Sequence, residues 1–233
     1  MSKGLIALVG GNEFRPESAS IDRLLIEHLG TSHTKVAILP TAAANEHPEL
    51  AGRNGVQHFR ALRVAAETVM IVDQASANDP GLVEQLSGAN LLYLAGGNPQ
   101  HLLQALIDSR AWRRISAMVG EGCVLAGSSA GAMVLCDAMY YGGLWQQALG
   151  MLPGICVVPH FAERPAGLLQ DLQSLLTGKG LVALGIDGAT ACVGHRDEWL
   201  VTGRGAVRVM TPVRADTFTT GESFSLAPYR AGR

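Results

Sequence analysis

The sequence lacks the features that would direct it to a membrane or a nucleic acid. No apolar run approaches the roughly 20 residues that a bilayer-spanning helix needs. The net charge is only −2, and no basic stripe is interleaved with aromatic residues, so nucleic acid and membrane are both excluded as expected partners. Charged residues make up 16% of the 233 positions and apolar residues 48%. This balance predicts a compact globular protein.

Cysteine is scarce, and the four thiols are far apart. None belongs to a CxxC pair or to a Cys/His spacing typical of a metal site, and most lie in apolar segments: Cys123, Cys136, Cys156 and Cys192. Isolated core thiols of this kind indicate a reduced, cytoplasmic protein. Neither HExxH nor GxGxxG is present, so we expect no metal and no organic cofactor.

Short aliphatic segments alternate with longer helical patterns along the first half of the chain. The expected strands cover residues 5–9, 35–39, 68–72, 90–94 and 123–126, and the expected helices cover 21–29, 52–66, 81–86, 99–106 and 111–120. Strands that are apolar on both faces and separated by helices predict a three-layer α/β fold around a mostly parallel sheet. The length fits a single α/β domain, residues 1–233.

The C-terminal third changes character, because its strand-like segments are shorter and are broken by glycine and charged turns. These segments are Ala189–Val193, Trp199–Thr202 and Ala206–Met210. They predict antiparallel hairpins at an edge of the same sheet.

Residues Gly127–Gly131, with the sequence GSSAG, connect an apolar strand to a helical segment. Strand, sharp turn and helix form the context in which a G-x-S-x-G pattern becomes a nucleophile elbow. Small neighbours let the backbone turn tightly and leave the hydroxyl of Ser129 clear of the strand end. The competing interpretation is an ordinary strand-to-helix turn, which a five-residue pattern does not exclude on its own.

Several other loops are expected at the same edge of the sheet as Ser129. In parallel α/β sheets the ligand crevice lies beyond the carboxyl ends of the strands, and three further strand exits have turn-forming or small residues: Gly10–Asn12, Thr41–Ala44 and Gly96–Asn98. In the first of these exits, Asn12 or Glu13 is placed where it could touch a substrate.

A serine nucleophile needs a base, and His160 is the best candidate among seven histidines. It follows the apolar segment Gly154–Pro159 and therefore leaves a strand at its carboxyl end. A carboxylate should hold its imidazole in one tautomer. Asp187, which ends another apolar strand, is the preferred candidate, and Asp137 and Glu163 are the alternatives.

The order of four motifs resembles the family of dipeptidase E and cyanophycinase, which are serine peptidases on a flavodoxin-like, class I glutamine-amidotransferase-like fold. The motifs are AGGNPQHLL (95–103), LAGSSAGAM (125–133), VVPHFAER (157–164) and GIDGATA (185–191). The resemblance implies Ser129 as nucleophile, His160 as base, and the N–H groups of Gly97 and Ala130 as the oxyanion hole. The order of serine, histidine and acid also differs from that of α/β-hydrolases, which argues against a lipase or esterase.

The chain departs from the family pattern at two places and matches it at a third. Cyanophycinase-like sequences carry a glutamate where this chain has Gly188, which leaves Asp187 to complete the triad or weakens the triad. Pro99 occupies the place of a glutamine, with Gln100 one position later, a spacing more like that of dipeptidases. Arg164 matches an H-F-x-x-R pattern and could hold a substrate carboxylate, although a solvated loop arginine explains it equally well. By resemblance, Asn98, Gln100 and Arg164 are expected to bind substrate.

The predicted reaction is acyl transfer from a short peptide with an aspartyl-type residue on the acyl side. An alternative is a catalytically weak binding or sensing module for an amino-acid-like ligand, which Gly188 favours. A glutamine-amidotransferase-like hydrolase would need a cysteine in place of Ser129. A homodimer is the default expectation for assembly, because two-fold dimers are the commonest oligomers.

Overall fold

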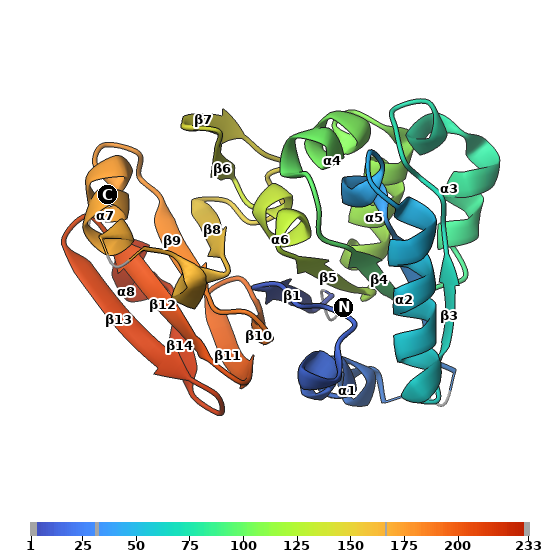
Figure 1. Cartoon of the computed structure of the whole chain (residues 1–233), viewed down its shortest axis with the longest axis horizontal. Coiled ribbons are helices and arrows are strands. Elements are labelled where there is room, and N and C mark those ends of the chain that lie inside the picture. Colours follow the sequence, from blue (N-terminus) through green and yellow to red (C-terminus); the bar gives the residue numbers. More distant parts are fainter. Residues whose placement is uncertain (1–3, 31–32, 166, 231–233) are drawn as a thin grey trace.

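The structure is a computed structural model that describes residues 4–30, 33–165 and 167–230 (Figure 1). Its larger sheet has eight strands in the order β14-β11-β10-β1-β5-β4-β2-β3. Five of them pair in parallel: β1 (Ile6–Val9), β5 (Val124–Ser128), β4 (Leu91–Leu94), β2 (Lys35–Leu39) and β3 (Ala65–Thr68). Three more continue the sheet in antiparallel pairing: β10 (Thr190–His195), β11 (Glu198–Gly203) and β14 (Ser223–Ser225). The predicted α/β fold is therefore confirmed.

Helices cover both faces of the parallel strands. One face packs against α1 (Ala19–Leu29) and α2 (Pro48–Ala61), and the other against α3 (Pro80–Leu86), α4 (Pro99–Leu106), α5 (Arg110–Gly120) and α6 (Ala130–Leu135). Figure 1 shows α1 below the central strands and α4 and α6 above them. In β1, Ile6 and Leu8 join one apolar cluster while Ala7 and Val9 join the other. Both faces of β1 are therefore buried, which explains why this strand is apolar throughout.

A second sheet of four strands packs against the antiparallel part of the first. Its order is β13 (Arg214–Thr219), β12 (Ala206–Thr211), β9 (Val182–Ile186) and β8 (Ile155–Pro159), and only β8 and β9 are parallel. Helices α7 (Leu168–Leu176) and α8 (Ala227–Arg230) accompany this sheet (Figure 1).

The prediction that all C-terminal hairpins extend one sheet is thus right for β10 and β11 and wrong for β12. After β11 the chain turns at Gly203, where φ is +114°. Strand β12 then pairs with β9, with Val207 opposite Ile186. Val207, Ile186 and Val201 share one buried cluster, so doubling back buries apolar side chains that an extended edge would expose.

The bounds of α2 and β3 and one hairpin also differ from the expectations. Helix α2 begins earlier than predicted because Pro48 occupies its first turn, and it ends before Arg63, whose φ is +62°. Strand β3 consequently ends at Thr68, where the predicted strand began. The hairpin of β6 (Ala138–Tyr141) and β7 (Leu144–Gln147) was not predicted.

In the described part of the chain, no helix combines the length and apolar character needed to cross a membrane.

Four 3-10 turns complete the described elements: η1 (Pro16–Ser18), η2 (Thr41–Ala43), η3 (Ser76–Asn78) and η4 (Phe161–Glu163). Two of them, η2 and η4, lie in loops that follow the strands β2 and β8. These loops leave the strands at their carboxyl ends, where the candidate site lies.

Candidate active site

Ser129 occupies a sharp turn between β5 and α6. Its backbone has φ +48° and ψ −105°, a region that residues with a side chain rarely adopt and that costs roughly 1–3 kcal/mol. The Ser129 amide donates to the carbonyl of Val9 at 2.9 Å. Behind the turn, a Cβ added to Gly127 would lie 2.6 Å from the carbonyl group of Gly131. The glycines of the motif therefore allow strand and helix to meet closely enough to force the serine into this turn.

The loop after β4 lies directly against Ser129. A Cβ added to Gly96 would be 3.4 Å from the Cβ of Ser129. Gly97 has φ +141°, and an added Cβ there would collide with the carbonyl of Ala42. Gly97, whose N–H was predicted to form part of an oxyanion hole, thus belongs to a loop that lies beside the turn leading into Ala130, the first residue of α6.

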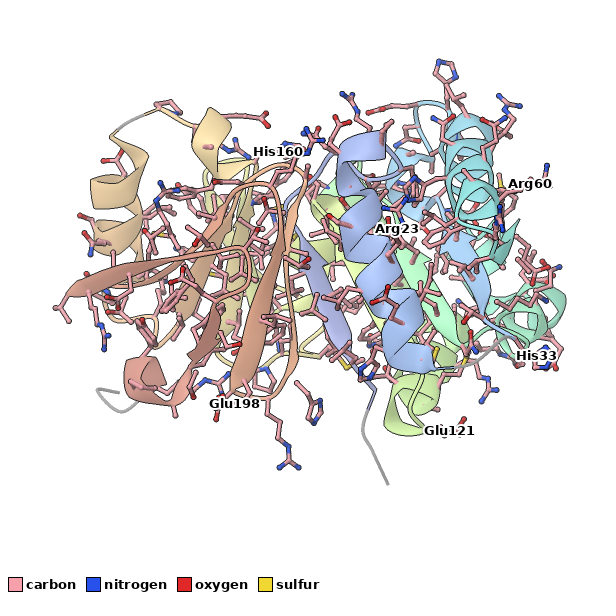
Figure 2. The ribbon with its side chains drawn as sticks, turned by 90° about the horizontal axis from the view of Figure 1, so that it is seen from below. Arg23, His33, Arg60, Glu121, His160 and Glu198 are labelled. Atoms are coloured by element: carbon pink, nitrogen blue, oxygen red, sulfur yellow. The ribbon has the colours of Figure 1, made fainter. Side chains whose placement is uncertain are left out.

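His160 follows β8 in a left-handed conformation, with φ +52° and ψ +42°. Its amide donates to the carbonyl of Gly10 at 2.9 Å. The imidazole lies against Gly11, where an added Cβ would collide with the ring and φ is +122°. Figure 2 shows His160 at the edge of the molecule opposite Glu121, which precedes β5. His160 therefore lies at the carboxyl ends of the parallel strands, as predicted from topology.

The carboxylate that contacts His160 is Glu163. Its Oε1 lies 3.3 Å from Nδ1 of the imidazole, and the two side chains are 59% and 29% exposed. Glu163 is three residues after His160 in the sequence. The left-handed backbone of His160 and the 3-10 turn η4 bring the two side chains together. A carboxylate only accepts hydrogen bonds, so Nδ1 is the donor and Nε2 is the nitrogen left to act on a serine.

Asp187, the acid preferred from the sequence, makes different contacts. Its Oδ2 accepts a hydrogen bond from the amide of Ala206 at 2.9 Å, and its Oδ1 lies 3.6 Å from a guanidinium nitrogen of Arg208. The same guanidinium lies 5.0 Å from the centre of the Phe161 ring. Asp187 thus supports the loop that carries His160, and its described contacts do not include the imidazole. The other alternative, Asp137, accepts from the amide of Gly154 at 2.9 Å.

Ser129 and His160 line one cavity of about 640 Å³. One wall of the cavity is formed by residues of α2 and by His47, which precedes this helix. The other walls are formed by the loops after β1, β2, β4 and β5 and by His160. The residues of the α2 wall are His47, Leu50, Ala51, Asn54, Gln57 and His58. Among the hydrogen bonds of the described residues, none joins the Ser129 hydroxyl to His160. Catalytic hydrogen bonds are often long before substrate binds.

The three residues predicted to bind substrate are not among the described residues that line this cavity. Asn98 caps α4, accepting hydrogen bonds from the amides of Gln100 and His101 at 2.9 and 3.1 Å. The Gln100 side chain is exposed, and Arg164 donates from Nε to the carbonyl of Pro159 at 3.3 Å. Arg15 is instead the arginine that lines the cavity.

Two acidic groups at or near the cavity make hydrogen bonds that the sequence did not predict, although Glu13 was expected as a residue that could touch a substrate. Glu13 accepts hydrogen bonds from the amide of Gly96 and the hydroxyl of Ser128, both at 2.7 Å. Asp22 lies 2.8 Å from Nε2 of His58, and burial raises the pKa of this carboxyl. Glu163 was visible in advance as an alternative acid three residues after His160, whereas nothing in the sequence singled out Asp22.

The model of peptidase family S51 matches residues 5–193, which include every loop of this site. The chain belongs to peptidase family S51. It is therefore a hydrolase of the peptidase type, and the resemblance to dipeptidase E and cyanophycinase is confirmed.

Curated relatives and solved structures agree with this assignment. The S51 chain is similar to the cyanophycinase of Synechococcus elongatus, with 27% identity over 90% of this chain and 69% of the relative. It is 28% identical to the cyanophycinase of Nostoc sp., over 91% of this chain and 74% of the relative. The crystal structure of a peptidase from an acI-B1 actinobacterium superposes with a TM-score of 0.84 and 29% identity over 96% of this chain and 97% of that chain. A putative peptidase E from Listeria monocytogenes, at 15% identity over 94% of this chain and 100% of that chain, shares the fold with a TM-score of 0.58.

The thiols of this S51 peptidase lie away from the site. All four cysteines are free and buried, and burial raises the pKa of both Cys123 and Cys156 to about 12. Within the described ranges, no group of three or more His, Cys, Asp or Glu side chains is arranged as a metal site.

Proposed function

We propose that the chain is a serine peptidase in which Ser129 is the nucleophile and His160 the general base, acting on short peptides with an aspartyl-type residue on the acyl side. The observation that carries this proposal is the turn at Ser129. A backbone held at φ +48° persists only where its surroundings enforce it, and such strain concentrates at functional sites. His160 lines the same cavity.

Glu163 is the proposed third member of the triad. Its contact with Nδ1 would fix the tautomer and stabilise the imidazolium that forms during the reaction. A Cβ added to Gly188 would lie 3.0 Å from Oε1 of Glu163. The Glu163 carboxylate thus lies beside the position where cyanophycinase-like sequences carry a glutamate. We infer that Glu163, three residues after His160, performs the role of the glutamate that this chain lacks at position 188. Asp187 supports the loop.

The proposed reaction proceeds through an acyl-enzyme. Oγ of Ser129 bonds to the carbonyl carbon of the substrate while its proton passes to Nε2 of His160. The N–H groups of Gly97 and Ala130 would hold the resulting oxyanion. When the C–N bond breaks, the imidazolium gives its proton to the leaving amine. Water then attacks the ester and loses a proton to His160. When the bond between the carbonyl carbon and Oγ breaks, the imidazolium returns this proton to Oγ of Ser129 and the acid is released.

The substrate class is inferred from the relatives and from the lining of the cavity. The relatives named above include cyanophycinases, and the cavity offers Arg15 for a carboxylate. Arg15→Ala and Arg164→Ala form a matched pair of variants. We expect Arg15→Ala to raise KM for acidic-residue peptides about tenfold, with a much smaller rise for neutral peptides. A larger and selective effect at Arg164 would restore the role predicted from the sequence.

Labelling with a fluorophosphonate probe tests the proposal, because only an activated serine reacts. Wild-type protein should be labelled, Ser129→Ala should not, and His160→Ala should be labelled far more slowly. A dipeptide library that includes β-aspartyl–arginine would then identify the substrate. If wild type and Ser129→Ala react equally little, the serine peptidase proposal fails. A folded, unreactive wild type that still binds dipeptides in calorimetry would support the binding-module alternative.

A further inference from the structure

The loop that follows β1, residues 10–15, contacts the parts of the site that come from distant segments. The carbonyl of Gly10 accepts from the amide of His160, and Gly11 lies against its imidazole. The carbonyl of Gly11 accepts from the amide of Ala189 at 3.0 Å. A short segment therefore holds the histidine loop and the loop after β9 at fixed positions.

Glu13 extends these contacts to the two loops of the proposed oxyanion hole. Its Oε1 accepts from the amide of Gly96, 83 residues away, and its Oε2 accepts from the hydroxyl of Ser128, 115 residues away. Both bonds measure 2.7 Å, and Ser128 is completely buried. Hydrogen bonds to an ionised carboxylate are shorter and stronger than those between neutral groups. One side chain thus links the two loops through both of its oxygens.

The two bonded groups stand next to the proposed oxyanion donors in the chain. Gly96 precedes Gly97, and Ser128 lies two residues before Ala130. An oxyanion hole works only when its donors are already positioned at about 2.7–3.1 Å from the developing charge. The spacing between the donors depends on how the loop after β4 sits against the turn at Ser129, and Glu13 connects these two segments.

We propose that Glu13 is a positioning residue that sets the geometry of the oxyanion hole by holding the Gly96–Gly97 loop against the Ser128–Ala130 turn. This inference rests on the proposed serine peptidase function. It assigns Glu13 no contact with the substrate and no proton transfer. Its effect should therefore fall on the transition state rather than on substrate binding, which means on kcat rather than on KM.

Two substitutions at Glu13 distinguish the effect of its hydrogen bonds from the effect of its charge. In Glu13→Gln the amide oxygen can still accept from Gly96, and its NH₂ can donate to the Ser128 hydroxyl after that hydroxyl rotates. The link survives without the charge, so we expect kcat within about threefold of wild type. Glu13→Ala removes the link. Because removing one oxyanion donor typically costs ~10²–10³ in kcat and this change displaces a donor, we expect kcat to fall roughly 10–10²-fold with KM nearly unchanged.

Ser128→Ala provides the matched control for the second bond. It should lower kcat by a smaller factor, and the double variant with Glu13→Ala should be no slower than Glu13→Ala alone, because both changes break the same link. Kinetics with the best dipeptide and the rate of fluorophosphonate labelling should change in parallel. Thermal melting of each variant checks the fold.

Several outcomes overturn the inference. A rise in KM at constant kcat would make Glu13 a substrate contact, and a Gln variant as slow as the Ala variant would make its charge the essential feature. If Glu13→Ala does not fold, Ser128→Ala decides the question, and an unchanged kcat there counts against the link. A labelled wild type with equally labelled Glu13→Ala refutes the inference alone, whereas an unlabelled wild type refutes the proposed function as well.

Discussion

Replacing Glu163 and Asp187 in parallel tests which acid serves His160. Glu163→Gln keeps an oxygen that can accept from Nδ1 but removes the charge, while Glu163→Ala removes both. Asp187→Asn keeps an acceptor for the amide of Ala206 and loses only the charge that faces Arg208. The two acids can therefore be compared by equally conservative changes.

The magnitude follows from the contact between Glu163 and the imidazole. Two unit charges about 4 Å apart interact by ~1 kcal/mol in water and by ~4 kcal/mol near a protein surface. The atoms here are 3.3 Å apart, but Glu163 is 59% exposed, so the imidazolium should lose roughly 1–3 kcal/mol of stabilisation. Since each 1.4 kcal/mol corresponds to a factor of ten, kcat should fall by about 10–100-fold in Glu163→Ala. We expect the smaller end of that range for Glu163→Gln, where the tautomer is retained.

The assay is steady-state hydrolysis of the best dipeptide, measured at low salt and in 1 M NaCl. At 1 M the screening length is about 3 Å, so the effect of Glu163→Gln should shrink with salt. Asp187→Asn should stay within about threefold of wild type at both salt concentrations. If Asp187→Asn instead loses activity 100-fold while Glu163→Gln is unaffected, the assignment of Glu163 is refuted, and the preference drawn from the sequence is restored.

Three further predictions concern packing around His160, the buried thiols and the buried pair of Asp22 and His58. Gly11→Ala should abolish peptidase activity because its Cβ would collide with the imidazole of His160, whereas Gly30→Ala, also at positive φ but with open space around it, should leave kcat unchanged. Iodoacetamide should neither label native protein nor inactivate it, because all four thiols are buried; mass spectrometry after unfolding in urea should find four alkylated cysteines. Asp22→Ala should lower the free energy of unfolding by about 1–3 kcal/mol, because it leaves Nε2 of the largely buried His58 without its hydrogen-bond partner, and a denaturant midpoint equal to that of wild type would contradict it.

The sequence was sufficient for most of the parallel part of the large sheet, β3 excepted, because its signals are local. Lys35–Leu39 and Pro99–Leu106 were predicted at the bounds that the structure has, since an apolar strand and a helix starting at proline both leave clear patterns. The sheet to which β12 belongs could not be predicted. Val207 and Val209 lie on the same face of β12 whether this strand extends the large sheet or pairs with β9. Only the burial of their side chains between two sheets decides the pairing.

The site was predictable to the extent that it follows from topology. Ser129 and His160 lie at the predicted edge of the sheet, because each terminates an apolar strand. The choice between Glu163 and Asp187 depended on geometry that no composition signals. A left-handed turn at His160 places the acid three residues later beside the imidazole, and the register of β9 against β12 places the Asp187 carboxylate on Ala206. The assignment of these side chains to catalytic roles stays a proposal that the labelling and kinetic experiments test.

The hydrogen bonds of Glu13 could not be predicted from the sequence either. A local pattern reports what a residue does within its own strand or helix, and Glu13 lies in a loop with no periodicity. Its two partners, Gly96 and Ser128, belong to other strand exits, so their spacing from Glu13 has no meaning until the sheet is assembled. The parallel sheet brings distant loops to one edge, and a carboxylate there can then join two of them. In the proposed oxyanion hole the two donors come from different segments of the chain, and the Glu13 carboxylate joins those segments through its two oxygens.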